Sequence, residues 1–241
     1  MNNNFIDIHS HILYGIDDGS RDINESINMI KKMKDLGFND IIITPHYIDG
    51  TSYQADNKKK IELLNIIKSK LDFDINLYLG NEIFIFDDID KYIKDNKISS
   101  LNNSKYILIE VPFVQEIVDL DKYVYKLIKA GYKVILVHPE RYTFIQSNPD
   151  NIIKYLDMGV LLQCNYQSIT GRYGHHAKKT IKYLLKHKYV SFLGSDIHRE
   201  NSSFYDNFGK IKKKILHITN EDYFKDITYN NILKVITNED I

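Results

Sequence analysis

Short apolar runs recur along the chain, and between them lie longer stretches in which apolar residues return every three or four positions. The short runs are mostly continuous and rich in β-branched residues, a pattern typical of parallel strands that are covered on both faces. We therefore predict strands over residues 5–8, 40–44, 75–79, 106–109, 133–137, 160–164 and 190–193.

The longer stretches predict helices. Residues 23–36 place Ile23, Ile27 and Ile30 on one face and are followed by Gly37, a residue type that often ends helices. By the same reasoning we expect further helices over residues 58–71, 119–130, 151–158 and 176–187.

Strands that alternate with helices indicate an α/β fold. Seven such strands favour a closed barrel, and an open doubly wound sheet is the alternative. The length of 241 residues fits one barrel, and no linker rich in proline, glycine or serine divides the chain. We therefore expect a single domain over residues 1–241.

Nearly every predicted strand is followed by a side chain that can bind a metal ion. Residues i and i+2 of a strand point to the same face, so His9 and His11 converge after the first strand. Asp196 and His198 do the same after the last. The other polar positions at or beyond strand ends are Asp17, Asp18, His46, Glu82, Glu110, His138 and Asn165. The C-terminal ends of barrel strands lie together, and imidazole with carboxylate suits first-row divalent ions, so we predict a polynuclear metal site there.

Each of these residues has an ordinary explanation when it is taken alone. A single histidine at a strand end is most often a hydrogen-bonded core residue, and Asp17–Gly19 is a turn signal. Their recurrence at the same end of successive strands is what favours a metal site. The other histidines lie in or beside helical patterns and are expected at the surface: His175, His176, His187 and His217.

Composition narrows the classes of function. Lys+Arg and Asp+Glu both total 32, and the resulting net charge of zero argues against nucleic-acid binding. The single cysteine, Cys164, excludes an internal disulfide framework and suits the reducing cytoplasm. The N-terminal residues lack the features of a signal peptide, and no apolar run approaches the roughly 20 residues of a membrane span. We expect a cytoplasmic protein that does not insert into a membrane.

The series of residues at the strand ends resembles that of the PHP (polymerase and histidinol phosphatase) superfamily. Within it, the chain is similar to the bacterial manganese-dependent tyrosine-protein phosphatases of capsule and exopolysaccharide operons. The similarity runs from residue 5 to about residue 200 and rests on Phe5–Ile12, Asp17–Gly19, Ile109–Glu110, His138–Tyr142 and Ser195–His198.

The resemblance implies a distorted seven-stranded (β/α) barrel with three divalent ions at the C-terminal ends of the strands. In the family's arrangement, the first ion is surrounded by His9, His11, Glu82 and Asp196. The second is bound by Glu82, which bridges the two ions, with Glu110 and His138. The third is bound by Asp18, His46 and His198. Manganese is the metal of the resembling family, and the ligand types also suit iron, zinc or cobalt.

The implied reaction is hydrolysis of phosphotyrosine on a protein by hydroxide bound to the metal ions. Arg141 is expected to grip a phosphate oxygen, and the alternative for it is a surface salt bridge with Glu140. In the family a second arginine lies several residues beyond the last histidine, where this chain has Ser203. Arg199 is the candidate for that contact, and the alternative is that Arg199 is simply exposed. Asp18 is a candidate acid for the leaving group. The implied partner is a phosphotyrosine protein, with a membrane-associated capsule tyrosine kinase as the example.

Other functions fit the sequence less well. Histidinol-phosphate phosphatase, or another small phosphomonoesterase, shares the metal pattern and is the main rival. A cysteine-based phosphatase is excluded because Thr170 stands where an arginine should follow Cys164. Many amidohydrolases have a bridging lysine where this chain has Glu110. A nuclease is disfavoured because no basic, aromatic-interleaved groove is evident. A non-enzymatic scaffold is disfavoured because it predicts missing ligands, whereas all nine expected positions are filled.

Residues 170–174 are either a flexible loop near the mouth of the site or an ordinary connection between a strand and a helix. The oligomeric state is not indicated.

Overall fold

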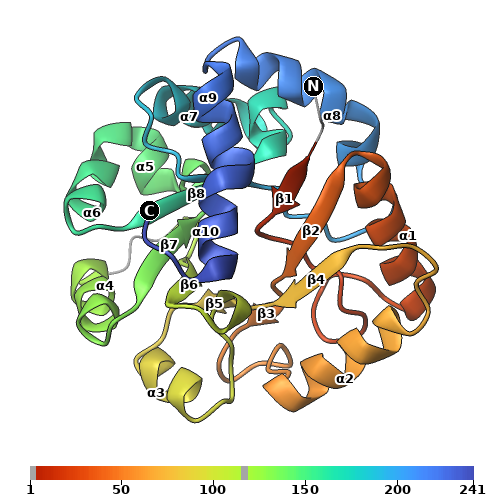
Figure 1. Ribbon diagram of the computed structural model, residues 1–241. Coiled ribbons are helices and arrows are strands. Elements are labelled where there is room, and N and C mark those ends of the chain that lie inside the picture. Colours follow the sequence, from red (N-terminus) through yellow and green to blue (C-terminus); the bar gives the residue numbers. More distant parts are fainter. Residues whose placement is uncertain (1–3, 115–118) are drawn as a thin grey trace.

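The strands of this chain run parallel and curl around a common axis, with helices on the outside (Figure 1). The structure, a computed structural model, describes residues 4–114 and 119–241. Its strands are β1 (Phe5–Asp7), β2 (Phe38–Ile43), β3 (His46–Tyr47), β4 (Asn76–Leu79), β5 (Glu82–Phe84), β6 (Tyr106–Glu110), β7 (Lys133–Val137), β8 (Leu161–Asn165) and β9 (Phe192–Gly194).

Neighbouring strands follow the order of the chain. One sheet has the order β1-β2-β4 and the other β3-β5-β6-β7-β8-β9, and every pair is parallel. The first and last strands approach each other where an isolated parallel bridge joins Ser10 to Ile197 and the Asp196 amide donates to the His9 carbonyl at 2.9 Å. This sequential order lacks the reversal of a doubly wound sheet and confirms the predicted barrel-like α/β fold.

All seven predicted strands are present, with bounds that differ by a few residues. The structure adds β3 and β5, which follow β2 and β4 after interruptions at Thr44–Pro45 and Gly80–Asn81. Pro45 has no amide hydrogen, so the ladder of β2 cannot continue through it. Its carbonyl accepts from the Glu82 amide at 3.1 Å, which links the two sheets beside the strand ends.

Helices cover the outside of the sheet. They are α1 (Ile23–Asp35), α2 (Asn57–Lys68), α3 (Ile89–Lys94), α4 (Leu120–Lys129), α5 (Thr143–Ser147), α6 (Ile153–Asp157), α7 (Gly174–Lys186), α8 (Ser203–Leu216), α9 (Glu221–Lys225) and α10 (Asn231–Thr237). Single turns of 3₁₀ or π geometry are η1 (Leu101–Asn103), η2 (Pro139–Arg141), η3 (Pro149–Ile152), η4 (Tyr166–Thr170) and η5 (Asp226–Asn230). None of the helices within the described ranges is both long enough and apolar enough to cross a bilayer.

The predicted helices are confirmed, although the one expected over residues 151–158 is divided between η3 and α6. Three glycines follow helices as expected. Gly37, Gly131 and Gly159 have φ angles of 95°, 96° and 86°, a region in which a side chain would be strained. The helix ends were therefore readable from the sequence.

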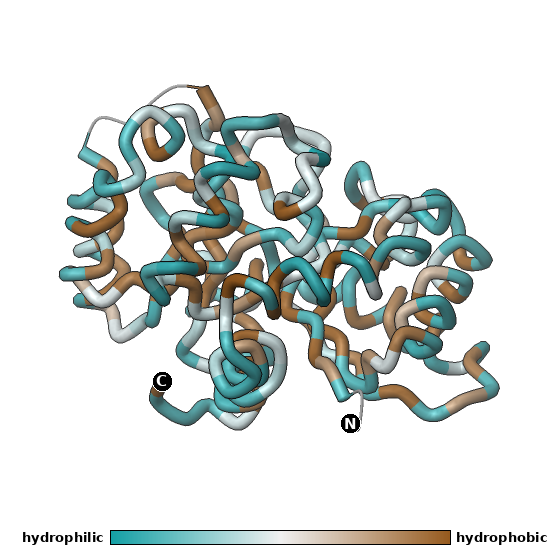
Figure 2. Tube along the Cα trace, turned by 90° about the horizontal axis from the view of Figure 1, so that it is seen from above, coloured by the Kyte–Doolittle hydropathy of each residue, from teal (hydrophilic) through white to brown (hydrophobic). Residues whose placement is uncertain are grey.

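The interior of the curled sheet is a small apolar core. α10 closes the N-terminal end of this core with Ile232 and Val235. On β6, Tyr106 and Leu108 point into the core, and the same alternation places Glu110 on the inward face at the C-terminal end of the strand. A larger apolar layer lies between the strands and the helices. Figure 2 shows hydrophobic and hydrophilic residues alternating along those helices, as amphipathic helices require.

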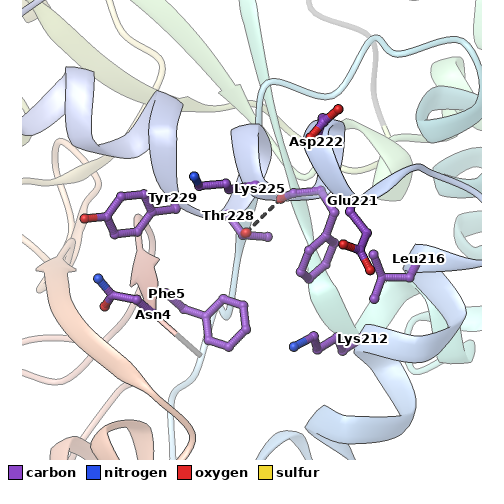
Figure 3. A pocket seen from close by; sticks show the side chains of 10 residues that line it. Asn4, Phe5, Lys212, Leu216, Glu221, Asp222, Lys225, Thr228 and Tyr229 are labelled. Atoms are coloured by element: carbon purple, nitrogen blue, oxygen red, sulfur yellow. Dashed lines mark hydrogen bonds between the residues drawn. The ribbon is translucent and has the colours of Figure 1, made fainter. Parts of the chain in front are cut away.

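A cavity of about 490 Å³ lies beside the start of β1, at the opposite end of that strand from the predicted site. Phe5, Phe224 and Tyr229 form its apolar walls, and Figure 3 shows the oppositely charged Lys212 and Glu221 around it. Among the described residues that line it, none belongs to the predicted site. The candidate chemistry therefore lies elsewhere, at the C-terminal strand ends.

Lys60 of α2 is fully buried behind the junction of β4 and β5. Its ammonium donates to Ser99 Oγ at 3.0 Å, to the Gly80 carbonyl at 3.3 Å and to Asn81 Oδ1. Asn81 in turn donates to the Pro45 carbonyl at 3.1 Å. Burial lowers the pKa of Lys60 to about 7, so the charged form reduces stability near neutral pH.

We predict that Lys60 makes the stability of the protein rise between about pH 7 and pH 10. In that window the unfolded lysine, with its ordinary pKa of 10.5, still holds its proton, while the folded one has lost it. The free energy of unfolding should rise by roughly 3 kcal/mol more in the wild type than in Lys60→Met. Urea unfolding at several pH values measures this, with the exposed Lys58→Met as control. Parallel pH profiles for wild type and Lys60→Met would contradict the prediction.

Candidate metal centre

The predicted metal ligands lie together at the C-terminal ends of the strands. His46 begins β3 just beyond the end of β2, Glu82 begins β5 just beyond the end of β4, and Glu110 ends β6. The others lie in the segments after β1, β7 and β9: His9, His11, Asp18, His138, Asp196 and His198. Most are buried, whereas the Asp18 side chain is 50% exposed and marks the open side of the cluster. The fold thus gathers residues from the whole length of the chain at one end of the barrel.

Glu82 lies at the middle of this cluster and is buried. Its Oε2 atom is 3.1 Å from His9 Nε2, 3.2 Å from His11 Nε2 and 3.1 Å from His46 Nδ1. Its Oε1 atom is 3.0 Å from His138 Nε2. Both oxygens of one carboxylate therefore face imidazole nitrogens, which come from β3 and from the segments after β1 and β7.

The remaining ligands extend the cluster on two sides. Asp196 Oδ1 is 3.5 Å from His11 Nε2. Asp18 Oδ1 is 3.6 Å from His46 Nε2 and 3.5 Å from His198 Nε2. The ligand atoms form three groups, and within each group they lie within 4.8 Å of one another, so that each group could hold an ion. The groups are His11, Asp18, His46 and His198; His9, His11 and Asp196; and His46, Glu82 and Glu110. The groups share His11 and His46, so they form one continuous site.

The pKa of each side chain in the cluster depends on the charges of its neighbours. Burial acts to raise the pKa of Glu82, but His9 and His46 outweigh it and hold that pKa well below its usual range. Burial, together with the neighbouring carboxylates of Glu82 and Asp196, raises the pKa of Glu110 to about 9. Burial also lowers the pKa of His138 to about 4, so its ring is neutral at neutral pH, the form that binds metals.

The residues present fit divalent metal ions. Within the described residues, the buried His46 Nδ1 has no hydrogen bond, although Glu82 Oε2 lies 3.1 Å from it, and the buried His138 Nδ1 has none either. A buried unpaired nitrogen is costly unless it binds something. Convergent imidazoles and carboxylates are the donor set that suits a first-row divalent cation. Glu110 is protonated at neutral pH, so binding of a cation there would release its proton.

Two further residues orient the histidine rings, and the sequence did not point to their role. Gln163 Oε1 accepts from His9 Nδ1 at 2.8 Å, and Asp17 Oδ2 is 2.8 Å from His11 Nδ1. Each contact turns the Nε2 atom of its ring toward the cluster, as partners of metal-bound histidines do. The available signal was the inward alternation of Gln163 and Asn165 at the end of the otherwise apolar β8.

The backbone is strained or crowded where it presents the ligands. His138 and Asp196 have φ angles of 32° and 51°, in the left-handed region that non-glycine residues seldom adopt. A Cβ atom on Gly194 would lie 2.9 Å from His9 Cβ, and one on Gly19 would lie 2.2 Å from the His11 carbonyl oxygen. Such strain is typical of functional sites, where the surrounding structure fixes the conformation.

Arg141 lies beside the cluster in a fixed orientation. Its guanidinium stacks between Phe113 and Tyr173, 4.3 Å and 4.4 Å from the ring centroids, and lies 3.3 Å from Asp196 Oδ2. The alternative of a salt bridge with Glu140 is wrong, because Glu140 is buried and accepts from Asn165 N and Ser168 Oγ instead. Arg141 is therefore positioned at the cluster of candidate metal ligands and not on an unrelated surface.

Arg199 has a different environment. Its Nη1 donates to the Gly19 carbonyl and lies 3.7 Å from Glu25 Oε2, so it contacts the turn that carries Asp18. Arg199 also lines a cavity of about 420 Å³ together with Arg141 and other residues. Its proposed contact with phosphate stays a prediction.

Arg172 and Tyr173, from the segment 170–174, line this cavity. It connects η4 to α7, and Tyr173 stacks on Arg141. The four histidines expected at the surface, His175, His176, His187 and His217, are exposed. They take no part in the cluster.

A parallel α/β barrel with histidines and carboxylates gathered at its C-terminal strand ends defines a metal-dependent barrel hydrolase. Sequence comparison identifies the family within this class. The family described as capsular polysaccharide synthesis, CpsB/CapC, matches residues 5–237 of the chain. The chain therefore belongs to the CpsB/CapC family.

Individual relatives span nearly the whole chain. CapC of Staphylococcus aureus is 33% identical over 98% of this chain and 96% of its own length. The tyrosine-protein phosphatase YwqE of Bacillus subtilis is 30% identical over 93% of this chain and 87% of its own length. A solved structure from work on YwqE and on CpsB of Streptococcus pneumoniae, described as metal-dependent tyrosine phosphatases, matches with a TM-score of 0.86 and 28% identity, covering 98% and 96% of the two chains.

We predict that Asp17→Asn weakens metal binding by about 10- to 100-fold, because the amide supports the His11 ring less well than a carboxylate does. A competition titration with a fluorescent chelator measures the affinity. Asp49→Asn, an exposed change outside the cluster, serves as the matched control. Equal affinities for Asp17→Asn and wild type would show that this contact does not tune the site.

Proposed function

We propose that the chain is a metal-dependent protein-tyrosine phosphatase. The observation that carries the proposal is the cluster of histidines and carboxylates around Glu82, which adjoins a cavity lined by Arg141. Relatives that match most of the chain are named tyrosine-protein phosphatases, and the solved ones are described as metal-dependent. These findings support a phosphotyrosine ester as the substrate.

The proposed cofactors are three divalent ions, with manganese taken from the resemblance and iron, zinc or cobalt also suited to the ligand types. Glu82 would help to hold two of them, because its two oxygens face different histidines. The proposed ligands are His9, His11, Asp18, His46, Glu82, Glu110, His138, Asp196 and His198.

Charge explains why phosphate would bind here. The proposed ligands include four carboxylates, so three divalent ions would leave two positive charges in excess and attract a phosphate dianion. When bound, such ions polarise phosphoryl oxygens and lower the pKa of a coordinated water, so that hydroxide is available near neutral pH. The protein's own part is to fix the geometry and to hold the phosphate.

Arg141 is proposed to hold a non-bridging phosphate oxygen. Its planar fork is pre-oriented by the rings of Phe113 and Tyr173, so little conformational entropy is lost when phosphate binds. Asp18 is assigned to metal binding, because a hydrogen bond with His198 lowers its pKa to about 2 and leaves it ionised at neutral pH. A tyrosine leaving group, with a pKa of about 10, has less need of a proton donor than an alkyl alcohol.

The proposed partner is a phosphotyrosine protein, and the capsule family of the chain supports a tyrosine kinase of capsule synthesis as that protein. A cytoplasmic location is part of the same proposal and rests on the single cysteine.

The reconstituted enzyme is expected to hydrolyse a phosphotyrosine peptide in preference to histidinol phosphate and to lose activity on chelation. His138→Ala should lower turnover by more than about 100-fold with the fold retained, because it removes a neutral imidazole from the cluster. Steady-state kinetics and circular dichroism measure these effects, with the exposed His187→Ala as control. Preference for histidinol phosphate would keep the metal site but reject the protein substrate. Activity that survives chelation and His138→Ala would reject the site.

Arg141→Lys should raise both the KM for a phosphotyrosine peptide and the inhibition constant of inorganic phosphate by about 10-fold or more. Lysine keeps the charge but loses the planar fork that stacks on the two aromatic rings. Kinetics with increasing phosphate as inhibitor measure the change. Equal inhibition constants of phosphate for Arg141→Lys and the wild type would reject the proposed contact between Arg141 and phosphate.

A further inference from the structure

Arginine is scarce in this chain, and three of its four arginines line one cavity. The sequence has 28 lysines but only Arg21, Arg141, Arg172 and Arg199 as arginines. The last three line the cavity of about 420 Å³ beside the metal centre, and no lysine is among the described residues of its wall. Arginine differs from lysine in a planar guanidinium that binds carboxylates and phosphates through two parallel hydrogen bonds. This placement indicates an anion-binding cavity.

The cavity is larger than a phosphate group requires. It begins at the metal centre, where Asp196 and His198 form part of its wall, and extends to Arg172 between η4 and α7. Its other walls are polar, with Gln167 Nε2 donating to Ser203 Oγ at 3.1 Å. Its volume falls in the range of sites for small organic ligands, so it has room for more of a substrate than the phosphate.

The three arginines differ in how far they are already engaged. Arg141 stacks between two rings and contacts Asp196, and Arg199 donates to the Gly19 carbonyl. Arg172 is exposed and has no hydrogen bond or ion pair with any residue in ranges 4–114 and 119–241. Its guanidinium is therefore available to a ligand that enters the cavity.

The position of Arg172 relative to Arg141 is set by the residue between them in space. Tyr173 follows Arg172 in sequence, and its ring stacks on the Arg141 guanidinium at 4.4 Å. The Tyr173 side chain is partly buried, and burial raises the pKa of its hydroxyl above its usual range. The two arginines consequently share one wall of the cavity.

We propose that Arg172 forms a second anion subsite, which binds a negatively charged side chain next to the phosphotyrosine of a peptide substrate. The inference rests on the proposed phosphatase function and adds a substrate class to it. A phosphotyrosine that reaches Arg141 through this cavity presents its neighbouring residue to Arg172. The bound group is a carboxylate or a second phosphate, because both match the guanidinium fork.

The test compares four substrates: free phosphotyrosine, a phosphotyrosine peptide with neutral neighbours, the same peptide with glutamate neighbours, and one with a second phosphotyrosine. The wild type should prefer the two anionic peptides to the neutral one. Arg172→Gln should lower kcat/KM on the preferred peptide by about three- to tenfold and leave free phosphotyrosine unchanged. Lys179→Gln removes the same charge from the exposed face of α7, outside the cavity, and should keep the preference.

The outcomes separate this inference from the proposed function. Loss of the preference in Arg172→Gln alone supports the subsite, and the better of the two anionic peptides identifies its group. Equal rates on neutral and anionic peptides in the wild type, or a preference that survives Arg172→Gln, would overturn the subsite while leaving the phosphatase intact. No turnover of free phosphotyrosine or of any peptide would instead reject the proposed function.

Discussion

The buried carboxylate of Glu82 is the group on which the rest of the site depends. Burying an ion costs several kcal/mol unless opposite charge and hydrogen bonds compensate for it. Here the compensation comes from His9, His11, His46 and His138, all within 3.2 Å of its two oxygens. Those histidines come from β3 and from the segments that follow β1 and β7, so the carboxylate fixes the relative positions of these strand ends. The same contacts that stabilise this end of the barrel also assemble the proposed metal ligands.

The fold supports this arrangement at each step. The pairing of β3 with β5 places His46 directly opposite Glu82, and the interruption at Pro45 separates β3 from β2 just before His46. Asp17 and Gln163 fix the rings from behind, and strained backbone at His138 and Asp196 aims those side chains at the cluster. Several kcal/mol of local strain and desolvation are thus concentrated at one end of the barrel, where a cation would relieve them.

Much of the fold and the ligand set could be predicted because their signals are local. Continuous apolar runs gave the seven strands, glycines such as Gly37 gave helix ends, and the nine expected ligands do lie at one end of the barrel. What was missed depends on contacts between distant residues. The strand β5 is too short to show a pattern, and α8 was not predicted. The ring-orienting role of Gln163 depends on His9, 154 residues away. The stack of Arg141 between Phe113 and Tyr173 likewise appears only once the chain is folded.

The most direct test of the central claim is anomalous diffraction from crystals of the manganese-loaded protein, recorded on both sides of the manganese absorption edge. Three peaks are expected at the C-terminal ends of the strands, two of them beside Glu82. Peaks that lie away from Glu82, or no peak among the four histidines that surround it, would show that this carboxylate does not organise a metal site.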